Sequence, residues 1–203
     1  MIKVLHLRSS GGFLGAEKVL TELGLLLPGL GIEPIIGIPV DQGDIPELAS
    51  RCVALGIRTE LFDFSNPLSL LGMRRIREFV KRERIDVIHT HGYREDIYAF
   101  LMLDRSRVVA TNHLWKRTTF KLSLYAALDA FVMRYFATLV AVSQPIFAEM
   151  HHLDLPPKKL KLIENGISLH HYETGFPRRR AARTALGLAD TDFVFGMVGS
   201  LSV

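Results

Sequence analysis

The sequence predicts an α/β fold in which helices cover both faces of a parallel sheet. Short apolar runs alternate with longer amphipathic runs over most of the 203 residues, and this alternation favours right-handed crossovers between parallel strands. The short runs are apolar throughout, as is typical of strands covered on both faces. Hydrophobic residues make up 48% of the chain, so a sizeable core can form.

The order of the elements follows from these runs. Seven apolar runs are predicted as strands, at residues 3–7, 34–38, 58–62, 86–89, 107–111, 138–142 and 160–163. Six amphipathic runs are predicted as helices, at residues 16–27, 45–55, 68–84, 96–103, 120–136 and 143–151. Helices and strands in this order form a first domain over residues 1–167.

The character of the chain changes after Ile167. The segment "SLHHYETGFPRRRAARTALGLADTD" is polar and basic, and it predicts one short helix at residues 178–186. The apolar run "FVFGMV" that follows predicts a strand that opens a second α/β unit. We therefore expect residues 168–203 to be a linker and the start of a second domain, and the chain to be one part of a larger protein.

Composition indicates which kinds of partner the protein binds and in which cellular compartment it resides. A formal net charge of +4 suits a phosphate-bearing partner or an anionic membrane surface. The single cysteine, Cys52, cannot form an internal disulfide, which favours a reducing, cytoplasmic compartment. The amino-terminus lacks a long apolar run, and the longest uncharged run, residues 135–148, is shorter than the roughly 18 residues of a membrane span.

The stretch "SSGGFLGAEKVL" places Gly11, Gly12 and Gly15 between the first strand and the first helix. The free N–H groups at a helix start attract anions, and glycines let a phosphate come close to the backbone. Ala16 and Glu17 after the last glycine exclude the phosphate loop of nucleotide triphosphatases. A tight turn without a ligand is the alternative.

A dinucleotide-binding loop fits this stretch only in part. Ser10, Gly12 and Gly15 give S-x-G-x-x-G, which lacks the first glycine of that fingerprint. Asp41 follows the second strand and is placed to bind a ribose. An NAD(P)-dependent oxidoreductase of the Rossmann type is therefore an alternative function.

Histidines gather where two predicted strands end. His89 and His91 lie two residues apart in "DVIHTHG", and His113 ends "VVATNH". Strand geometry points the first pair to one face, and ligands of open α/β sheets bind at these carboxyl ends. We expect His113 and His91 to contact a sugar or phosphate, and His89 and the strand residue His6 to be buried.

A metal site is the second interpretation of these histidines. Together with Glu95 or Asp96 they can serve as ligands of a metal-dependent hydrolase that uses His89, His91 and His113. No second carboxylate stands at a convincing spacing, so we expect no metal. A binding module without catalytic activity is a third alternative.

Two basic segments offer surfaces. In "LLGMRRIREFVKRERI" we expect Leu71, Ile76, Phe79 and Val80 to face the sheet and the basic residues, Arg74, Arg75, Arg77, Lys81, Arg82 and Arg84, to form a solvated face or a surface for anionic lipid. In "LWKRTTFKLSLYAALDAFVMRYF", residues such as Trp115, Phe120 and Lys121 can receive an amphiphilic acceptor, and residues 122–132 are expected in the core.

Six motifs in order resemble one family. They are "GGFLGAEKVL", "IDVIHTHG", "VVATNH", "LVAVSQPIFAEM", "KLKLIENGISLHHY" and "FGMVGSLS". Each motif is weak alone, but their order and spacing are similar to those of the amino-terminal domain of retaining GT-B-fold glycosyltransferases of family 4. The resemblance covers essentially the whole chain and ends in the first strand of the donor domain.

The resemblance implies transfer of a sugar from a nucleotide-sugar donor to a glycan or lipid-linked acceptor, with retention, in cell-surface polysaccharide synthesis. It implies two Rossmann-like domains with the active site between them and no metal. The basic helices favour peripheral contact with the inner face of the membrane, and because no regular aromatic–basic interleave is present we expect no nucleic acid. The candidate site residues are His113 as the catalytic residue and Gly11, Gly12, Gly15, Glu17, His91, Tyr93, Asn165, Gly166 and Gly199 as substrate-binding residues.

The chain departs from the family pattern at two places. Gly199-Ser200-Leu201 stands where the family usually has Gly-Arg-Leu, so a phosphate-contacting arginine is absent. Ser168 stands where an aspartate is usual, which is a local capping change. By itself, the chain is expected to supply the acceptor side of the cleft and to be inactive.

Overall fold

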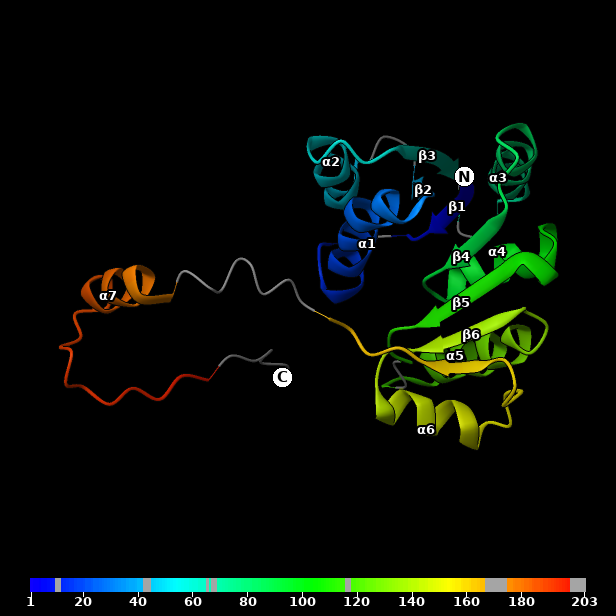
Figure 1. Cartoon of the computed structure of the whole chain (residues 1–203). Helices are drawn as coiled ribbons and strands as arrows, with labels where there is room; N and C mark the ends of the chain where they lie inside the picture. Colours follow the sequence, from blue (N-terminus) through cyan, green and yellow to red (C-terminus); the bar gives the residue numbers. More distant parts are fainter. Residues whose placement is uncertain are drawn as a thin grey trace. The chain divides into compact units, whose positions relative to one another are not determined.

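The computed structural model describes residues 1–9, 12–41, 45–64, 66, 69–115, 118–166 and 175–197. The chain divides into two compact units, Met1–Asn165 and Gly166–Val203, each of which is described by itself (Figure 1). The candidate residues Gly11 and Gly199 lie outside the described residues, as do Lys116 and Arg117 of the second basic segment.

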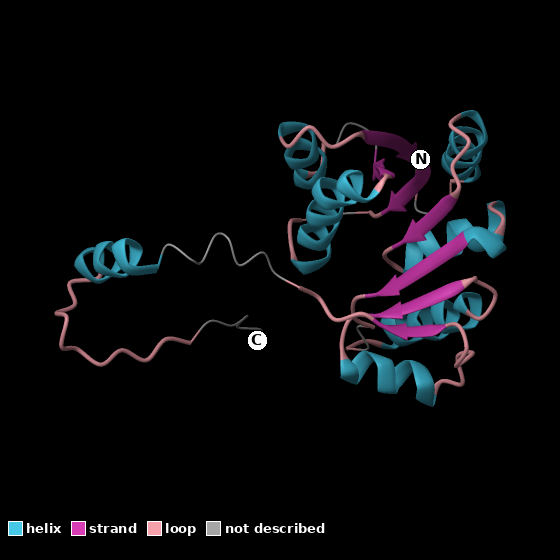
Figure 2. Ribbon diagram, in the orientation of Figure 1, coloured by secondary structure: helices cyan, strands magenta, loops and turns pink. Residues whose placement is uncertain are grey.

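A parallel sheet forms the centre of the first unit (Figure 2). Among the described residues its strands are β1 (Ile2–Leu7), β2 (Ile32–Asp41), β3 (Thr59–Phe64), β4 (Val87–Thr90), β5 (Val108–Asn112), β6 (Thr138–Ala141) and β7 (Leu160–Leu162), in the order β3-β2-β1-β4-β5-β6-β7. Each strand overlaps one that the sequence predicts, so the predicted parallel α/β sheet is confirmed.

Helices connect consecutive strands. They are α1 (Gly15–Leu26), α2 (Glu47–Ala54), α3 (Leu70–Arg82), α4 (Tyr93–Met102), α5 (Phe120–Met133) and α6 (Gln144–His152), with short 3-10 turns η1 (Leu27–Leu30) and η2 (Arg105–Arg107). The predicted helices are confirmed with boundary shifts of at most three residues: α4 begins three residues earlier than expected, directly after Gly92, and α5 ends three residues earlier.

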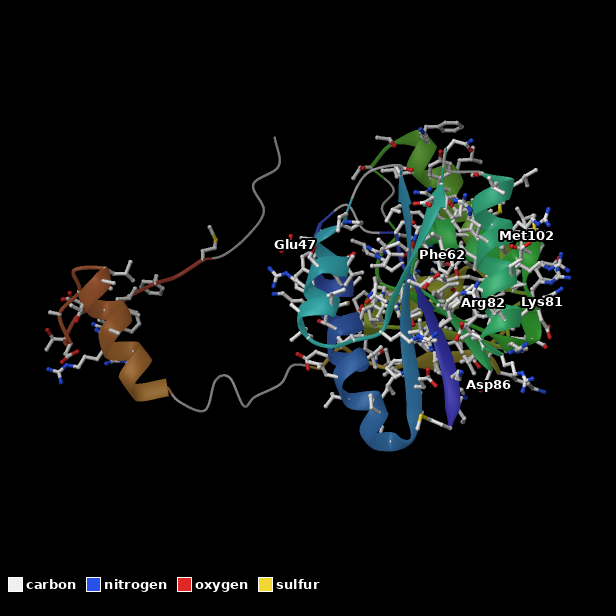
Figure 3. All side chains as sticks on the ribbon, turned by 90° about the horizontal axis from the view of Figure 1, so that it is seen from above. Glu47, Phe62, Lys81, Arg82, Asp86 and Met102 are labelled. Atoms are coloured by element: carbon white, nitrogen blue, oxygen red, sulfur yellow. The ribbon has the colours of Figure 1, made fainter. Side chains whose placement is uncertain are left out.

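Two apolar clusters show which helices cover which face. Alternate residues of β1 point to opposite faces: Leu5 and Leu7 join the cluster built by α3, α4, α5 and α6. His6 pairs in register with Ile36, and Ile36 packs in the second cluster with α1 and α2. Figure 3 shows the two layers, with Glu47 of α2 on one side of the sheet and Lys81 of α3 on the other.

The basic face of α3 is largely as expected. Ile76, Phe79 and Val80 are buried and the six basic residues are exposed. Leu71, however, is exposed, and Met73 takes the buried position instead. The reason is the start of the helix at Leu70, which leaves Leu71 in the first turn and facing solvent.

The second unit contains α7 (Gly175–Ala185), which confirms the predicted short helix. The strand expected at the apolar run after it is wrong for the described residues, because 193–197 are irregular and Phe193, Phe195 and Met197 are exposed. A strand needs a neighbour with free backbone N–H and C=O groups, and the described residues of this unit contain no second strand.

Gly72 of α3 controls how closely α3 approaches the sheet. A Cβ there would lie 2.6 Å from Cδ2 of Phe64, and Phe64 is itself fully buried and stacked on Tyr98 of α4 with ring centroids 4.8 Å apart. We predict that Gly72→Ala lowers the free energy of unfolding by about 1–3 kcal/mol, because the rings cannot yield.

Urea unfolding monitored by circular dichroism measures this effect. Gly29→Ala is the matched control, since a Cβ at Gly29 would meet nothing within 4 Å. Equal unfolding midpoints for the two variants would contradict this account of the α3 packing.

Candidate functional site

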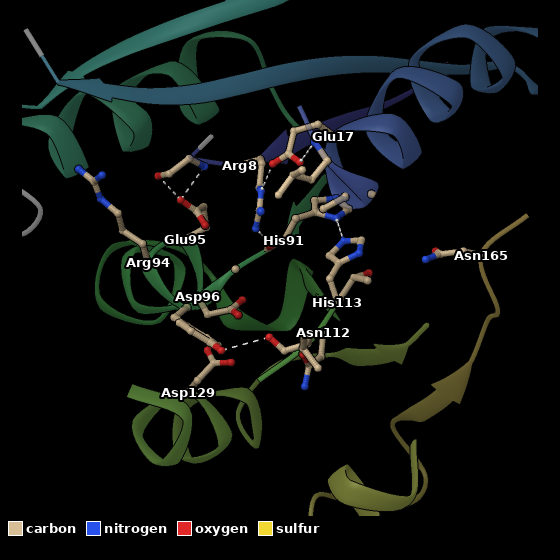
Figure 4. A pocket seen from close by; sticks show the side chains of 18 residues that line it. Arg8, Glu17, His91, Arg94, Glu95, Asp96, Asn112, His113, Asp129 and Asn165 are labelled. Carbon is tan, nitrogen blue, oxygen red and sulfur yellow. Dashed lines mark hydrogen bonds and ion pairs between the residues drawn. The ribbon is translucent and has the colours of Figure 1, made fainter. Parts of the chain in front are cut away.

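A hollow of about 480 Å³ opens at the carboxyl edge of β1, β4 and β5 (Figure 4). Its lining comes from the end of β1, the start of α1, the turn from β4 into α4, the end of β5, and single residues of α5 and the chain after β7. The lining residues are Arg8, Ser9, Leu14–Glu17, His91–Asp96, Thr111–Leu114, Asp129 and Asn165. This edge is where open α/β sheets bind their ligands.

Six candidate residues from the sequence line the hollow. They are Gly15, Glu17, His91, Tyr93, His113 and Asn165. Gly12 is described but is not among the lining residues. Gly166 is the first residue of the second unit, so it is not placed relative to the hollow.

Two helices begin at the hollow, α1 at Gly15 and α4 at Tyr93. At α1, Glu17 Oε2 accepts a hydrogen bond from the Leu14 N–H, at 3.0 Å. At α4, a Cβ on Gly92 would lie 2.8 Å from Glu95 Oε2 and 3.0 Å from Arg8 Nη1. A side chain at residue 92 would therefore displace the charged ends of Glu95 and Arg8.

Arg8 ties three segments together. Its Nε donates to Glu17 Oε1 at 2.8 Å, and its Nη1 donates to the His91 carbonyl oxygen at 2.5 Å. Burial alone would raise the pKa of Glu17, but the hydrogen bond and charge of Arg8 together lower it. Glu17 is thus an anion that holds Arg8 in place at the carboxyl end of β1.

Glu95 fixes the start of the glycine loop. Its Oε1 accepts hydrogen bonds from the Ser9 N–H, at 2.9 Å, and from the Ser9 hydroxyl. Burial raises the pKa of Glu95, against the opposing effect of Ser9 and Arg8. The contact joins the end of β1 to α4 across the floor of the hollow.

Four imidazoles lie side by side on the α1 face of the sheet. His6 Nδ1 is 3.2 Å from His91 Nε2, and His91 Nδ1 is 3.1 Å from His113 Nε2. His89 Nε2 is 2.7 Å from Thr111 Oγ1. His6 is fully buried, as expected. His89 is partly buried, and its ring forms a hydrogen bond with the Thr111 hydroxyl.

Burial keeps these imidazoles uncharged. It lowers the pKa of His6 and of His113 to about 4, with Arg8 adding to the effect at His113. Burial, reinforced by neighbouring histidines, lowers the pKa of His89 and His91 well below the usual value. Within the described chain, ring nitrogens of His6, His89 and His91 lie within 4.8 Å of one another and are the group best placed to hold a metal ion.

Two buried carboxyl groups face each other between α4 and α5. The Thr90 hydroxyl donates to Asp96 Oδ1, and Trp115 Nε1 donates to Asp129 Oδ2 at 2.7 Å. Burial, then the charge of Asp129 and a hydrogen bond with it, raise the pKa of Asp96 well above its ordinary value. Burial raises the pKa of Asp129 to about 6. Both carboxyl groups are therefore easier to protonate than exposed ones.

The segment that leads into α5 differs from expectation. Trp115, expected beside an acceptor, is buried against Asp129. Residues 122–132 were expected in the core, but Leu124, Leu128 and Phe131 are exposed. Only one side of the helix is buried, where Ala126, Asp129, Ala130, Val132 and Met133 pack.

Sequence patterns missed Arg8, Ser9 and Asp129. Arg8 and Ser9 directly follow the first strand, so the rule that ligands bind at carboxyl ends was a usable signal for them. Asp129 lies inside an apolar helix, where a lone carboxylate among core residues is the signal.

The Asp96–Asp129 pair should make stability depend on pH. A carboxyl whose folded pKa is raised stabilises the fold below its unfolded pKa and loses that contribution as pH rises through the folded value. We predict that Asp129→Asn, whose amide can still bond Trp115 and Asp96, removes a fall of about 2–3 kcal/mol in unfolding free energy between pH 4 and 7.

Chemical denaturation across that pH range tests the pair. Asp154→Asn, at an exposed position, should leave the fall in stability unchanged. If the unmodified chain and both variants follow parallel pH profiles, the pair does not titrate as described.

Comparisons with known proteins identify the fold. The model of Glycosyltransferase Family 4 matches residues 14–171. The chain is 23% identical over 210 residues to the Escherichia coli UDP-Gal:alpha-D-GlcNAc-diphosphoundecaprenol alpha-1,3-galactosyltransferase, covering 98% of this chain and 54% of that enzyme.

Solved structures of glycosyltransferases have the same fold as this chain. Anabaena HepE in complex with UDP and glucose superposes with a TM-score of 0.70 at 20% identity, over 92% of this chain and 50% of HepE. Sucrose-phosphate synthase from Thermosynechococcus elongatus superposes with a TM-score of 0.64 at 13% identity, over 93% and 53%. The chain thus spans about half the length of these relatives.

These matches do not favour the oxidoreductase or the metal-dependent hydrolase. Asp41, which the oxidoreductase would need for a ribose, lies 3.8 Å from Arg94 in an ion pair. The sheet and its helices form the amino-terminal Rossmann-like half of a GT-B fold. Because the family model matches more than half of the residues of the chain, the chain belongs to Glycosyltransferase Family 4.

Proposed function

We propose that this chain is the acceptor-side half of a retaining glycosyltransferase, which moves a sugar from a nucleotide-sugar donor to a glycan or lipid-linked acceptor in cell-surface polysaccharide synthesis. The observation that carries the proposal is the convergence of the family's segments, from α1, α4 and the end of β5, on one hollow at the carboxyl edge. Retention is part of the proposal and rests on the family resemblance alone.

The donor we propose is a UDP-sugar. HepE binds UDP and glucose, and the E. coli relative uses UDP-Gal. In this chain Arg8 and the amino-termini of α1 and α4 border the hollow. Helix amino-termini stabilise anions near them, which supports a phosphate-bearing ligand here.

Within the proposed reaction, His113 contacts the donor sugar near the reaction centre. Its imidazole is neutral, so it can form a hydrogen bond without adding charge to the site. Gly15 lines the hollow, and a Cβ there would meet nothing within 4 Å, so the glycine keeps space open for ligand. Asn165 borders the hollow, and we propose that Gly12 and Gly166 lie close to the substrates.

We propose no metal cofactor. The carboxylates of the hollow have protein partners: Glu17 pairs with Arg8, Glu95 with Ser9, and Asp129 with Trp115. His6 and His91 bond each other. A metal ion would have to break these contacts, and developing charge on a leaving diphosphate can be stabilised by Arg8 and the helix amino-termini instead.

We also propose peripheral contact with an anionic membrane, through α5. No helix in the described residues is long and apolar enough to span a bilayer. The outer side of α5 exposes a stripe of apolar and aromatic residues, Phe120, Leu124, Tyr125, Leu128 and Phe131, and Tyr135 follows it. Lys121 lies over the Tyr125 ring and Arg105 over the Tyr135 ring.

The stripe suits lipid better than α3 does. An apolar stripe with basic neighbours is the pattern of interfacial helices. Several basic residues of α3 instead pair with acids, as in Arg74–Glu78 and Arg75–Asp63. The E. coli relative acts on a sugar linked to diphosphoundecaprenol, which is consistent with an acceptor that resides in a membrane.

The role of His113 is open to direct test. We predict that His113→Ala lowers turnover of the two-domain transferase by about 10²–10³-fold, because one preorganised polar contact near the reaction centre is lost. Turnover of UDP-sugar into product is measured with folding checked by circular dichroism. His152→Ala, at an exposed position of α6, is the control; near-normal turnover of the His113 variant would remove this residue from the site.

Membrane contact is tested by co-sedimentation with phosphatidylglycerol vesicles at low salt. We predict that the triple change Leu124→Ser, Leu128→Ser and Phe131→Ser lowers the bound fraction at least several-fold, since each residue loses its apolar contact with lipid. The matched control is Leu25→Ser with Leu26→Ser, which changes exposed leucines at the end of α1. Equal binding of both variants would exclude α5 as the contact surface.

A further inference from the structure

We propose that His6, His91 and His113 act as one chain of hydrogen-bonded imidazoles that fixes which ring nitrogen His113 presents to the hollow. In this chain His113 carries its proton on Nδ1, and His6 and His91 are positioning residues. The consequence for catalysis rests on the proposed function, which puts His113 in contact with the sugar substrate.

Strand register places the three rings. His6 of β1 pairs in register with His89 of β4, and the His91 N–H continues the ladder by donating to the Leu7 carbonyl at 3.1 Å. His91, two residues after His89, therefore projects from the same face of the sheet as His6 and lies nearer the carboxyl edge. Arg8 bonds the His91 carbonyl and so holds the backbone of the middle ring.

Both nitrogens of His91 are in use. Nε2 lies 3.2 Å from His6 Nδ1, and Nδ1 lies 3.1 Å from His113 Nε2. Since His113 uses Nε2 inward, Nδ1 is the nitrogen that remains for a ligand in the hollow that His113 lines. The outer ring is thus oriented by contacts with the inner rings.

An uncharged imidazole has one N–H and one lone pair, so each ring donates on one side and accepts on the other. Burial holds these three rings in the uncharged form. The series can then run in only two directions: every ring donates outward from Nδ1, or every ring donates inward from Nε2. An intermediate arrangement would set two N–H groups or two lone pairs against each other.

The inner end of the series favours the outward direction. His6 Nε2 is buried and has no hydrogen-bond partner in the described structure. The inward direction would leave an N–H at that atom without an acceptor, and orphaned buried N–H groups are the rarer and costlier defect. In the outward direction, the lone pair of His6 Nε2 has no donor, and His113 Nδ1–H becomes a donor to the hollow.

The donor fits an oxygen of the sugar substrate, either a hydroxyl or a phosphate oxygen. No proton needs to leave His113 in this arrangement. The two inner rings act by excluding the other tautomer, in which Nδ1 would be a lone pair and would repel such an oxygen.

The tautomers are read by nitrogen NMR of the chain labelled with ¹⁵N-histidine, near pH 7. We expect His113 to be protonated on Nδ1 and not on Nε2, while the exposed His152 shows a mixture. His91→Leu removes the inner partner, and His113 should then become a mixture as well. His91→Asn, whose amide can stand where Nδ1 stood, should restore the Nδ1 proton.

Protonation of His113 on Nε2 in the unmodified chain would overturn the proposal, whether or not the variants fold. So would an unchanged His113 tautomer in folded His91→Leu. Zn²⁺ added at one equivalent is a further probe: joint shifts of His6, His89 and His91 would show a metal cluster in place of the hydrogen-bonded series.

Kinetics separate this inference from the proposed function. In the two-domain transferase, His91→Leu should lower kcat about 10–100-fold and His91→Asn should recover most of it, with KM little changed. If the tautomers behave as expected but both variants turn over normally, the chain of imidazoles stands and the assignment of His113 to the reaction falls.

Discussion

The parallel pairing of β1 with β4 is the constraint on which the site depends. It sets Leu7 opposite Thr90 and lets the His91 N–H extend the ladder to Leu7. The chain leaves β1 toward β2 on one side and leaves β4 toward β5 on the other, so α1 and α4 diverge and a hollow opens between their starts. A slip of one residue would turn His91 to the opposite face, and the histidine series would not exist.

Much of the fold could be predicted because apolar runs and strands are the same segments in this chain. His91, His113 and Glu17 could be placed at one edge because parallel strands share their carboxyl ends. Two contacts could not be predicted from the sequence, those of Arg8 with Glu17 and of Trp115 with Asp129. Tertiary packing, and not a local pattern, brings these residues together. Hydropathy alone also placed residues 122–132 inside, although only one side of α5 meets the core.

The charges of the hollow are balanced in a way that suits an anionic ligand. Its acidic residues outnumber its arginines, which alone would repel phosphate. Glu17 is held as the partner of Arg8, however, and burial raises the pKa of Glu95, Asp96 and Asp129, which makes these three groups less readily charged than exposed carboxylates. The histidines stay uncharged, and the amino-termini of α1 and α4 add partial positive charge at the rim.

The same packing that buries Asp129 leaves the other side of α5 outside. Ala126, Asp129, Ala130, Val132 and Met133 occupy the inner side of the helix, so Leu124, Leu128 and Phe131 lie on the exposed side. Leu114 follows His113, lines the hollow and is exposed, and its carbonyl accepts a hydrogen bond from the Tyr93 hydroxyl at 3.1 Å. Under the proposed function, the hollow takes the sugar head of the acceptor, and the exposed side of α5 lies against the lipid that holds its tail.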